Sequence, residues 1–277
     1  MDGIMVTEMA KPFLRWAGGK SWFIKHLPQI IQEQKYVNYY EPFLGGGAVF
    51  FSLGPNVKAK LSDINAELIN TYIQVRDNVD DVIDVLRTFE NTADFYYEIR
   101  NKNFENLIEK AAQFIYLNQT SFNGLYRVNL RGQYNVPYGY RTKAFLEEDK
   151  LKMASRALSN SEIRVSDFWD TLSEVVPGDL FFLDPPYTTS HNNNGFVKYN
   201  QKMFSLDDQY RLSRSIDQLK EKGAYYILTN AAHSVIRDIF DKGDKIYELN
   251  RASLIGGDNA SRGRIQEYVF TNLRNEV

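Results

Sequence analysis

The sequence predicts an α/β protein with a mainly parallel sheet and an inserted, mainly helical lobe. Two observations support the sheet: short strand-like runs alternate with helical stretches in the first quarter of the chain, and the alternation returns after about residue 160. A third supports the lobe, since helical patterns follow one another from about residue 65. We therefore expect a main domain of residues 1–64 and 145–277, and a lobe of residues 65–144.

Each predicted strand is a short run of strand-favouring residues between turn signals. The first covers 36–43 and leads into a glycine turn, and the second, 57–61, ends at Ser62 and Asp63. The remaining predicted strands are 162–165, 179–183, 224–229, 245–249 and 265–271. The predicted helices of the lobe are 66–75, 82–89 and 111–117.

A further helix is predicted over 205–222 by its ends and its apolar face. Ser205 and Asp208 have the spacing of a capping box, and Gly223 follows the last turn. The apolar face consists of Leu212, Ile216 and Leu219. Such a helix is expected to cover one face of the sheet.

Composition indicates an ordinary globular protein. The 277 residues include 33 Lys+Arg and 35 Asp+Glu, for a net charge of −2, and no cysteine. The lack of cysteine excludes a disulfide framework, a cysteine-based zinc site and a cysteine nucleophile. The histidines show no metal-ligand spacing, so no metal is predicted. The first ten residues do not resemble a signal peptide and no apolar run could span a membrane, so a cytoplasmic location is expected.

A glycine-rich turn at residues 41–47 (EPFLGGG) joins a predicted strand to an apolar helix start. Glycines let the backbone approach a ligand closely. The spacing from Gly45 to Phe50 lacks the third glycine of a dinucleotide fingerprint, which disfavours a nicotinamide oxidoreductase. Asp63 ends the next strand, where an acidic residue can bind ribose hydroxyls. An adenosyl ligand without a pyrophosphate fits both observations; a structural turn is the alternative.

Residues 13–21 (FLRWAGGKS) lie upstream of that turn. The end of this segment resembles a phosphate-binding loop, but Leu14 stands where that loop requires glycine, which excludes a kinase or ATPase motif. Trp16 and Lys20 are suited to stacking a flat ligand and pairing with its carboxylate.

The most specific motif is Asp184-Pro185-Pro186-Tyr187, directly after an apolar strand. Ligands of parallel sheets bind at the carboxyl ends of strands. A carboxylate and the Pro185 carbonyl could accept the two hydrogens of an exocyclic amine and direct its lone pair toward a methyl donor. Tyr187 could stack on a base flipped out of a duplex. A proline-rich turn without chemistry is the alternative.

Between Lys110 and Leu146 the chain has no acidic residue, while basic and aromatic residues alternate. The basic residues are Lys110, Arg127, Arg131, Arg141 and Lys143, and the aromatics include Phe122, Tyr126, Tyr134, Tyr138 and Tyr140. Local positive charge supplies affinity for phosphates, and arginine can read guanine. The segment predicts a DNA-binding surface; a solvated loop is the alternative.

These motifs, in this order, resemble the Dam-type (D12 class) DNA adenine-N6 methyltransferases. The resemblance rests on residues 16–20 (WAGGK), 41–47 (EPFLGGG), 62–65 (SDIN), 122–127 (FNGLYR), 135–139 (NVPYG) and 184–187 (DPPY). It implies a Rossmann-like, SAM-dependent methyltransferase sheet with an inserted DNA-recognition lobe. It also implies methyl transfer from S-adenosyl-L-methionine (SAM) to a flipped adenine in a short palindrome, commonly GATC. Double-stranded DNA is the expected partner, in a bacterial or phage-infected cell.

The resemblance implies three groups of site residues. The catalytic group is Asp184, Pro185, Pro186 and Tyr187. The SAM-binding group is Trp16, Lys20, Glu41, Phe43, Gly45, Gly47, Asp63, Asp167, Phe168 and Asp184. The DNA-binding group is Phe122, Asn123, Arg127, Asn129, Arg131, Pro137 and Arg141, with Phe122 as the wedge and Arg127 as a guanine reader. In one departure, Tyr140 follows Gly139 where the family tends to have arginine, and Arg141 comes next.

Two alternatives remain. A cytosine-N4 methyltransferase needs similar amine activation, but those enzymes more often carry Ser before Pro-Pro-Tyr, so Asp184 disfavours this activity. An inactive DNA-binding relative is disfavoured because Lys20, Asp63 and the tetrad 184–187 are all intact.

Overall fold

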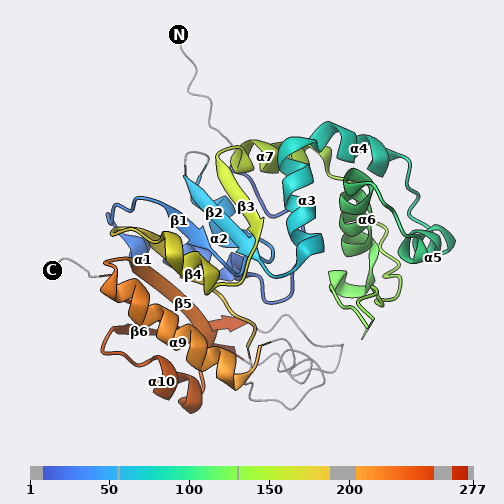
Figure 1. Ribbon diagram of the computed structural model, residues 1–277. Helices are drawn as coiled ribbons and strands as arrows, with labels where there is room; N and C mark the ends of the chain where they lie inside the picture. The colour runs from blue at the N-terminus through green and yellow to red at the C-terminus, as the bar shows by residue number, and fades with distance from the viewer. Residues whose placement is uncertain (1–8, 55–56, 130, 188–203, 253–263, 274–277) are drawn as a thin grey trace, which may run out of the picture. The chain divides into compact units, whose positions relative to one another are not determined.

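The computed structural model describes residues 9–54, 57–129, 131–187, 204–252 and 264–273 (Figure 1). Within these ranges, seven strands form one mostly parallel sheet in the order β3-β2-β1-β4-β5-β7-β6. The strands are β1 (Tyr39–Glu41), β2 (Ala59–Asp63), β3 (Ser161–Val165), β4 (Leu180–Leu183), β5 (Tyr225–Ala231), β6 (Lys245–Ala252) and β7 (Arg264–Thr271). The predicted α/β class, with a Rossmann-like, mainly parallel sheet, is confirmed.

The chain divides into two compact units. The first unit comprises Met1–Ile24 and Leu44–Val165, and the second comprises Lys25–Phe43 and Ser166–Val277. The expected lobe, residues 65–144, lies inside the first unit. Its two boundaries stay a prediction.

In the first unit, β2 and β3 pair in parallel, from Ala59 opposite Ser161 to Asp63 opposite Val165. Its helices are η1 (Lys20–Trp22), α2 (Ala48–Ser52), α3 (Ala66–Asp77), α4 (Val79–Arg87), α5 (Ala93–Asn101), α6 (Leu107–Thr120), η3 (Phe122–Gly124) and α7 (Glu148–Leu158). Helix α3 packs against both α6 and α7 and buries an apolar face that includes Tyr72. That face is part of the hydrophobic core of the unit.

In the second unit, β1, β4 and β5 are parallel, and β7 runs antiparallel between β5 and β6. The other helical elements of the described chain are η2 (Ile24–His26), α1 (Leu27–Ile31), η4 (Asp170–Glu174), α9 (Leu206–Glu221) and α10 (Ser234–Phe240). Helix α9, orange in Figure 1, lies against β5. Its capping box between Ser205 and Asp208 is confirmed, and its predicted apolar residues join the buried core.

All seven predicted strands are present, with shifted ends. The largest difference is in the first, predicted over 36–43 and observed as Tyr39–Glu41. Pro42, which follows it, has no backbone N–H to donate to a neighbouring strand. The predicted helix 111–117 begins earlier, at Leu107, because the Asn106 side chain accepts hydrogen bonds from two backbone N–H groups of the first turn.

Four α-helices of the described residues were not predicted, and each has a weak sequence signal; the shortest is α1, with 5 residues. Helix α5 (Ala93–Asn101) contains the aromatic run 95–97, whose residues are only moderate helix formers. Helix α7 (Glu148–Leu158) buries small alanines beside Leu151 and Leu158, so few large apolar residues mark its buried face in the sequence. Helix α10 has only 7 residues, which is less than two full turns, so the helix is too short to show an apolar periodicity in the sequence.

No helix in the described part of the chain combines the length and the apolar composition that crossing a bilayer requires. Within the same ranges, no three or more His, Asp and Glu side chains are grouped so that they could hold a metal ion. Residues 1–8, most of the segment compared with a signal peptide, lie outside the described residues.

Candidate functional site

The glycine turn is held by backbone and side-chain hydrogen bonds within the first unit. Leu44 N–H donates to the Ser62 carbonyl at 3.0 Å, and Gly45 N–H donates to Asp63 Oδ2 at 3.1 Å. The Tyr72 hydroxyl donates to the Gly45 carbonyl at 3.0 Å. These contacts bring the turn and the end of β2 together. The SAM-binding role of Gly45 and Asp63 stays a prediction. Tyr72 has no sequence signal beyond its place on the apolar face of α3.

Glycine is required at two positions of this turn. Gly45 has φ +46° and Gly47 has φ +64°, a region that side chains with a Cβ adopt with difficulty. A Cβ on Gly45 would lie 2.7 Å from Nε1 of Trp16, closer than van der Waals contact allows. The bare glycine backbone therefore lets the Trp16 ring lie directly on the turn.

Trp16 lies against the glycine turn. Trp16 stacks on Tyr126, with ring centroids 5.5 Å apart and an interplanar angle of 21°. Lys20 begins η1, is buried, and its Nζ donates to the Gly18 carbonyl at 2.9 Å. The structure thus brings Trp16, Gly45 and Asp63 into one cluster of direct contacts.

The Asp63 carboxylate has a specific electrostatic environment. Burial raises the pKa of Asp63, while backbone N–H groups of Asn65, Gly45 and Ile64 act in the opposite direction. Its second oxygen, Oδ1, accepts from Asn65 N–H at 3.0 Å. A carboxylate at the end of a strand, beside a glycine turn, matches the group that binds ribose hydroxyls in nucleotide sites.

A second cluster of predicted residues lies within the second unit. Phe43 stacks on Phe168 with centroids 5.4 Å apart. Asp167 accepts from Trp169 N–H and forms an ion pair with Arg211 of α9, whose guanidinium lies 4.4 Å from the Phe168 ring centroid. Glu41 is buried and accepts from the Tyr39 hydroxyl at 2.6 Å. Arg211 was not predicted, because an arginine on a helix carries no signal of its partner.

Side chains of β5 and β7 bond to the two ends of the Asp184–Tyr187 tetrad. Strand β4 ends at Leu183, so Asp184 emerges at the carboxyl edge of the sheet, as predicted. Thr229 Oγ1 donates to Asp184 Oδ1 at 2.7 Å, and the Tyr187 hydroxyl donates to Glu267 Oε2 at 2.5 Å. Neither Thr229 nor Glu267 was predicted as a site residue. The arrangement places a half-buried carboxylate and an aromatic ring at the end of a buried strand.

The basic aromatic segment folds back on itself in the first unit. Phe122 N–H donates to the Pro137 carbonyl and Gly139 N–H donates to the Thr120 carbonyl, each at 2.9 Å. A Cβ on Gly139 would lie 2.5 Å from the Ser121 carbonyl oxygen, so only glycine permits this close approach. The motifs at 122–127 and 135–139 are thereby brought side by side, although the sequence alone did not show that they meet.

The predicted DNA-contact residues of this segment differ in their surroundings. The side chains of Phe122, Asn123, Arg127, Arg131 and Pro137 are exposed, and Asn129 is half-buried. Asn135 accepts hydrogen bonds from Arg127 through its side-chain oxygen at 2.8 Å and its carbonyl at 3.1 Å. The Arg127 guanidinium is therefore held in a defined orientation.

The Arg141 guanidinium bonds within the protein, whereas the Tyr140 side chain is largely exposed. Arg141 Nη1 donates to the Gln119 carbonyl at 3.1 Å, so this guanidinium bonds to the protein itself. Tyr140 is 76% exposed and has φ +52°. The DNA contact of Arg141 stays a prediction.

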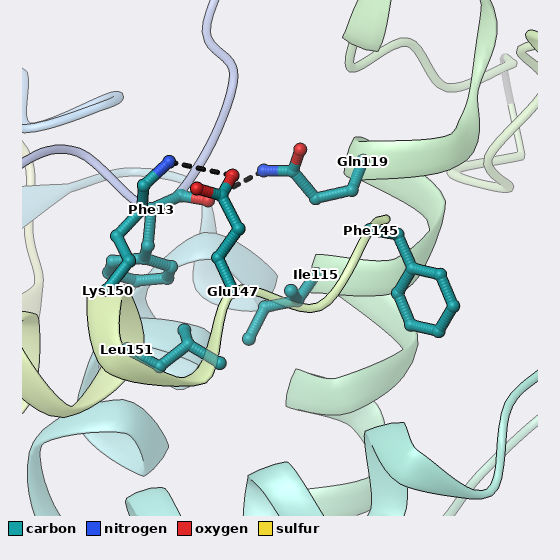
Figure 2. Close-up of a pocket in the computed structure, with 7 residues that line it drawn as sticks. All are labelled: Phe13, Ile115, Gln119, Phe145, Glu147, Lys150 and Leu151. Atoms are coloured by element: carbon teal, nitrogen blue, oxygen red, sulfur yellow. Dashed lines mark hydrogen bonds and ion pairs between the residues drawn. The ribbon is translucent and has the colours of Figure 1, made fainter. Parts of the chain in front are cut away.

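A small pocket beside Phe13 is lined by none of the predicted site residues (Figure 2). It is lined by Phe13, Ile115, Gln119, Phe145, Glu147, Lys150 and Leu151. In Figure 2 the Gln119 amide points to the Phe13 carbonyl, with a hydrogen bond of 2.7 Å, and Lys150 pairs with Glu147. The hydrogen bond from Gln119 of α6 to Phe13 holds the segment that leads to Trp16 against α6.

A family model and several curated relatives match the chain over most of its length. A family model described as D12 class N6 adenine-specific DNA methyltransferase matches residues 16–254. The type II methyltransferase M1.LlaDCHI of Lactococcus lactis subsp. cremoris is 35% identical over 276 residues, covering 96% of each chain. The type II methyltransferase M.MjaIII of Methanocaldococcus jannaschii is 38% identical over 244 residues, 80% of this chain and 84% of that one. The DNA adenine methylase of Escherichia coli K12 is 28% identical over 270 residues, 94% of each chain.

Proposed function

The chain belongs to the D12 class of N6 adenine-specific DNA methyltransferases, and from this we propose that it methylates a flipped adenine in a short palindromic DNA site, with GATC as the expected sequence. S-adenosyl-L-methionine is the proposed methyl donor. The observation that carries the proposal is the tetrad at the end of β4, where Thr229 donates to the Asp184 carboxylate.

The residues present fit SAM as a ligand. Asp63 offers a carboxylate at a strand end, suited to ribose hydroxyls, and the missing Cβ atoms of Gly45 and Gly47 leave the turn open to close approach. Trp16 and Lys20 of the first unit would bind the methionine portion. Glu41, Phe43, Asp167 and Phe168 of the second unit stay predicted SAM-binding residues, as the family resemblance implies. Bound SAM supplies an electrophilic methyl group on a sulfonium.

The proposed chemistry needs orientation more than acid–base strength. The Asp184 carboxylate and the Pro185 carbonyl would accept the two hydrogens of the N6 amine and direct its lone pair in line with the methyl group. A nitrogen–carbon bond forms as the sulfur–carbon bond breaks, and one amine proton then leaves to Asp184 or solvent. No covalent enzyme–base intermediate is needed, and the chain has no cysteine to form one. Tyr187 would stack on the flipped base.

DNA recognition is proposed for the basic aromatic segment of the first unit. Phe122, 52% exposed at the start of η3, would insert into the duplex and replace stacking lost when the adenine leaves the helix. Asn123 follows Phe122 in the chain, and Pro137 lies next to Phe122 through the Phe122–Pro137 hydrogen bond. Both residues would contact the adjacent base steps. Asn129, Arg131 and Arg141 would contact the sugar-phosphate backbone of the DNA.

The direct test uses labelled SAM and two duplexes, one containing GATC and one with the site scrambled, followed by nucleoside analysis. We expect N6-methyladenine only in the GATC duplex. Methyladenine in both duplexes would retain the reaction and overturn the proposed site. N4-methylcytosine would replace the proposed reaction by its alternative, and absence of transfer would indicate an inactive relative.

Replacing Arg127 by alanine is expected to relax sequence preference. Asn135 orients the Arg127 guanidinium, and a guanine read by one arginine is worth about 1–3 kcal/mol of discrimination. The ratio of methylation on cognate and one-base-altered duplexes should fall by about tenfold or more. The matched variant is Arg131→Ala, also an exposed arginine of this segment, which should weaken binding to both duplexes equally. Equal losses on both duplexes for Arg127→Ala would refute its reading role.

A further inference from the structure

Strand register brings two side chains of neighbouring strands to the tetrad. In the parallel pair β4–β5, Leu183 lies opposite Leu228, so Asp184 comes next to Thr229. In the antiparallel pair β5–β7, Ala231 lies opposite Glu267. Side chains alternate along a strand and opposed residues share a face, so Thr229 and Glu267 lie on the same face of the sheet.

Both side chains are fully buried and both bond to the tetrad. Thr229 and Glu267 are each 0% exposed. Thr229 donates to the first residue of the tetrad, Asp184, and Glu267 accepts from the last, Tyr187. A buried hydroxyl or carboxylate is costly without a hydrogen-bond partner, so each contact favours one orientation of the tetrad residue. The two residues thus constrain the tetrad at both ends.

We propose that Thr229 and Glu267 are positioning residues for methyl transfer, with Thr229 setting the plane of the Asp184 carboxylate and Glu267 setting the plane of the Tyr187 ring. This inference rests on the proposed adenine methylation. The amine can be oriented only if the acceptor oxygen of Asp184 has a fixed direction. A tyrosine ring stacks on a base only when its face is turned to it, and its hydroxyl bond to Glu267 restricts that rotation.

The chain provides a matched control in Thr271. Thr271 lies on β7, is also fully buried, and donates its hydroxyl to the Tyr226 carbonyl at 2.6 Å instead of to the tetrad. Thr271→Val therefore removes a buried hydrogen bond from the same sheet without touching the tetrad. Any loss common to Thr229→Val and Thr271→Val is structural, and the excess loss in Thr229→Val measures positioning.

The test compares kcat, the dissociation constants for SAM and DNA, and thermal midpoints across the variants. Thr229→Val should lower kcat by about 10-fold to 100-fold, the range expected for misplaced reacting groups, while both dissociation constants change by less than about threefold. Thr229→Ser, which keeps the hydroxyl, should recover most of kcat. Thr271→Val should lower only the thermal midpoint.

Glu267 is tested by Glu267→Leu, Glu267→Gln and Tyr187→Phe. Glu267→Gln retains an oxygen that accepts from Tyr187 and should recover most of the kcat that Glu267→Leu loses. Tyr187→Phe breaks the same hydrogen bond without altering Glu267, so the double variant Tyr187→Phe/Glu267→Leu should lose no more than the larger single loss. A duplex with 2-aminopurine at the target adenine reports stacking on Tyr187, and its fluorescence should change in Glu267→Leu and not in Thr271→Val.

The outcomes separate the two proposals. A wild-type protein that methylates adenine, with Thr229→Val and Glu267→Leu as active as Thr271→Val, overturns the positioning role and leaves the proposed function intact. Additive losses in the double variant also overturn the role of Glu267. A wild-type protein that methylates no adenine overturns both proposals.

Discussion

Replacing Asp184 by alanine is expected to abolish methyl transfer, with a loss in kcat of about 10³-fold or more. Asp184 supplies the carboxylate that is proposed to accept a hydrogen of the amine, and Thr229 donates to its Oδ1. Asp184→Asn keeps the shape and an acceptor for Thr229, but its amide N–H₂ can turn toward the substrate amine as a donor. Both variants should therefore be inactive. Single-turnover methylation of a cognate duplex measures the loss.

The control for Asp184 lies at the other end of the same strand. Asp179, fully buried directly before β4, accepts hydrogen bonds from Asn38 and from the Val176 N–H. Asp179→Asn alters a buried carboxylate that holds the loop, so it should lower the thermal midpoint while each folded molecule keeps its kcat. Circular dichroism and DNA binding should show that Asp184→Ala is folded. Near-wild-type turnover in Asp184→Ala would exclude the tetrad as the catalytic group.

Replacing Gly45 by alanine is expected to weaken SAM binding by about tenfold or more, because the new Cβ has two unfavourable effects. A residue at φ +46° costs about 1–2 kcal/mol when it carries a side chain. The Cβ would also lie 2.7 Å from Trp16 Nε1, so the ring or the turn must move. Both groups belong to the proposed SAM site. Isothermal titration with SAM measures the change.

The variant Gly243→Ala is the control that separates the cost of a positive φ from the cost of the steric clash. Gly243 has φ +74° and no atom within 4 Å of an added Cβ, so Gly243→Ala carries the strain without the clash. We expect Gly243→Ala to lower the thermal midpoint slightly and to leave SAM affinity unchanged. If Gly45→Ala binds SAM as tightly as Gly243→Ala does, the turn is not part of the SAM site.

Much of the fold could be predicted because its signals are local. The capping box of α9 needs only Ser205 and Asp208, three residues apart. The strands were found because each is a short run between turn residues, and the tetrad follows β4 without interruption. Strand ends shifted by a few residues because tertiary hydrogen bonding, which decides where a strand stops, has no local signal.

Part of the candidate site could not be predicted, because its contacts join distant parts of the chain. Tyr72 bonds to a carbonyl 27 residues away, and Arg211 pairs with an aspartate 44 residues away. The residue types gave no indication of these partners. Likewise, nothing in the sequence indicated that the Arg141 guanidinium donates to the Gln119 carbonyl, and its DNA contact stays a prediction.

The resemblance of the ordered motifs to the D12 class was enough to predict an α/β adenine methyltransferase, and the chemistry of the residues after β4 was enough to single out the tetrad. Strand pairing alone brought Thr229 and Glu267 to that tetrad, from 45 and 80 residues away. The physical reason is that a motif consists of adjacent residues, whose chemistry can be read from the sequence. The orientation of its side chains depends on hydrogen bonds to strands that come close only in the folded sheet.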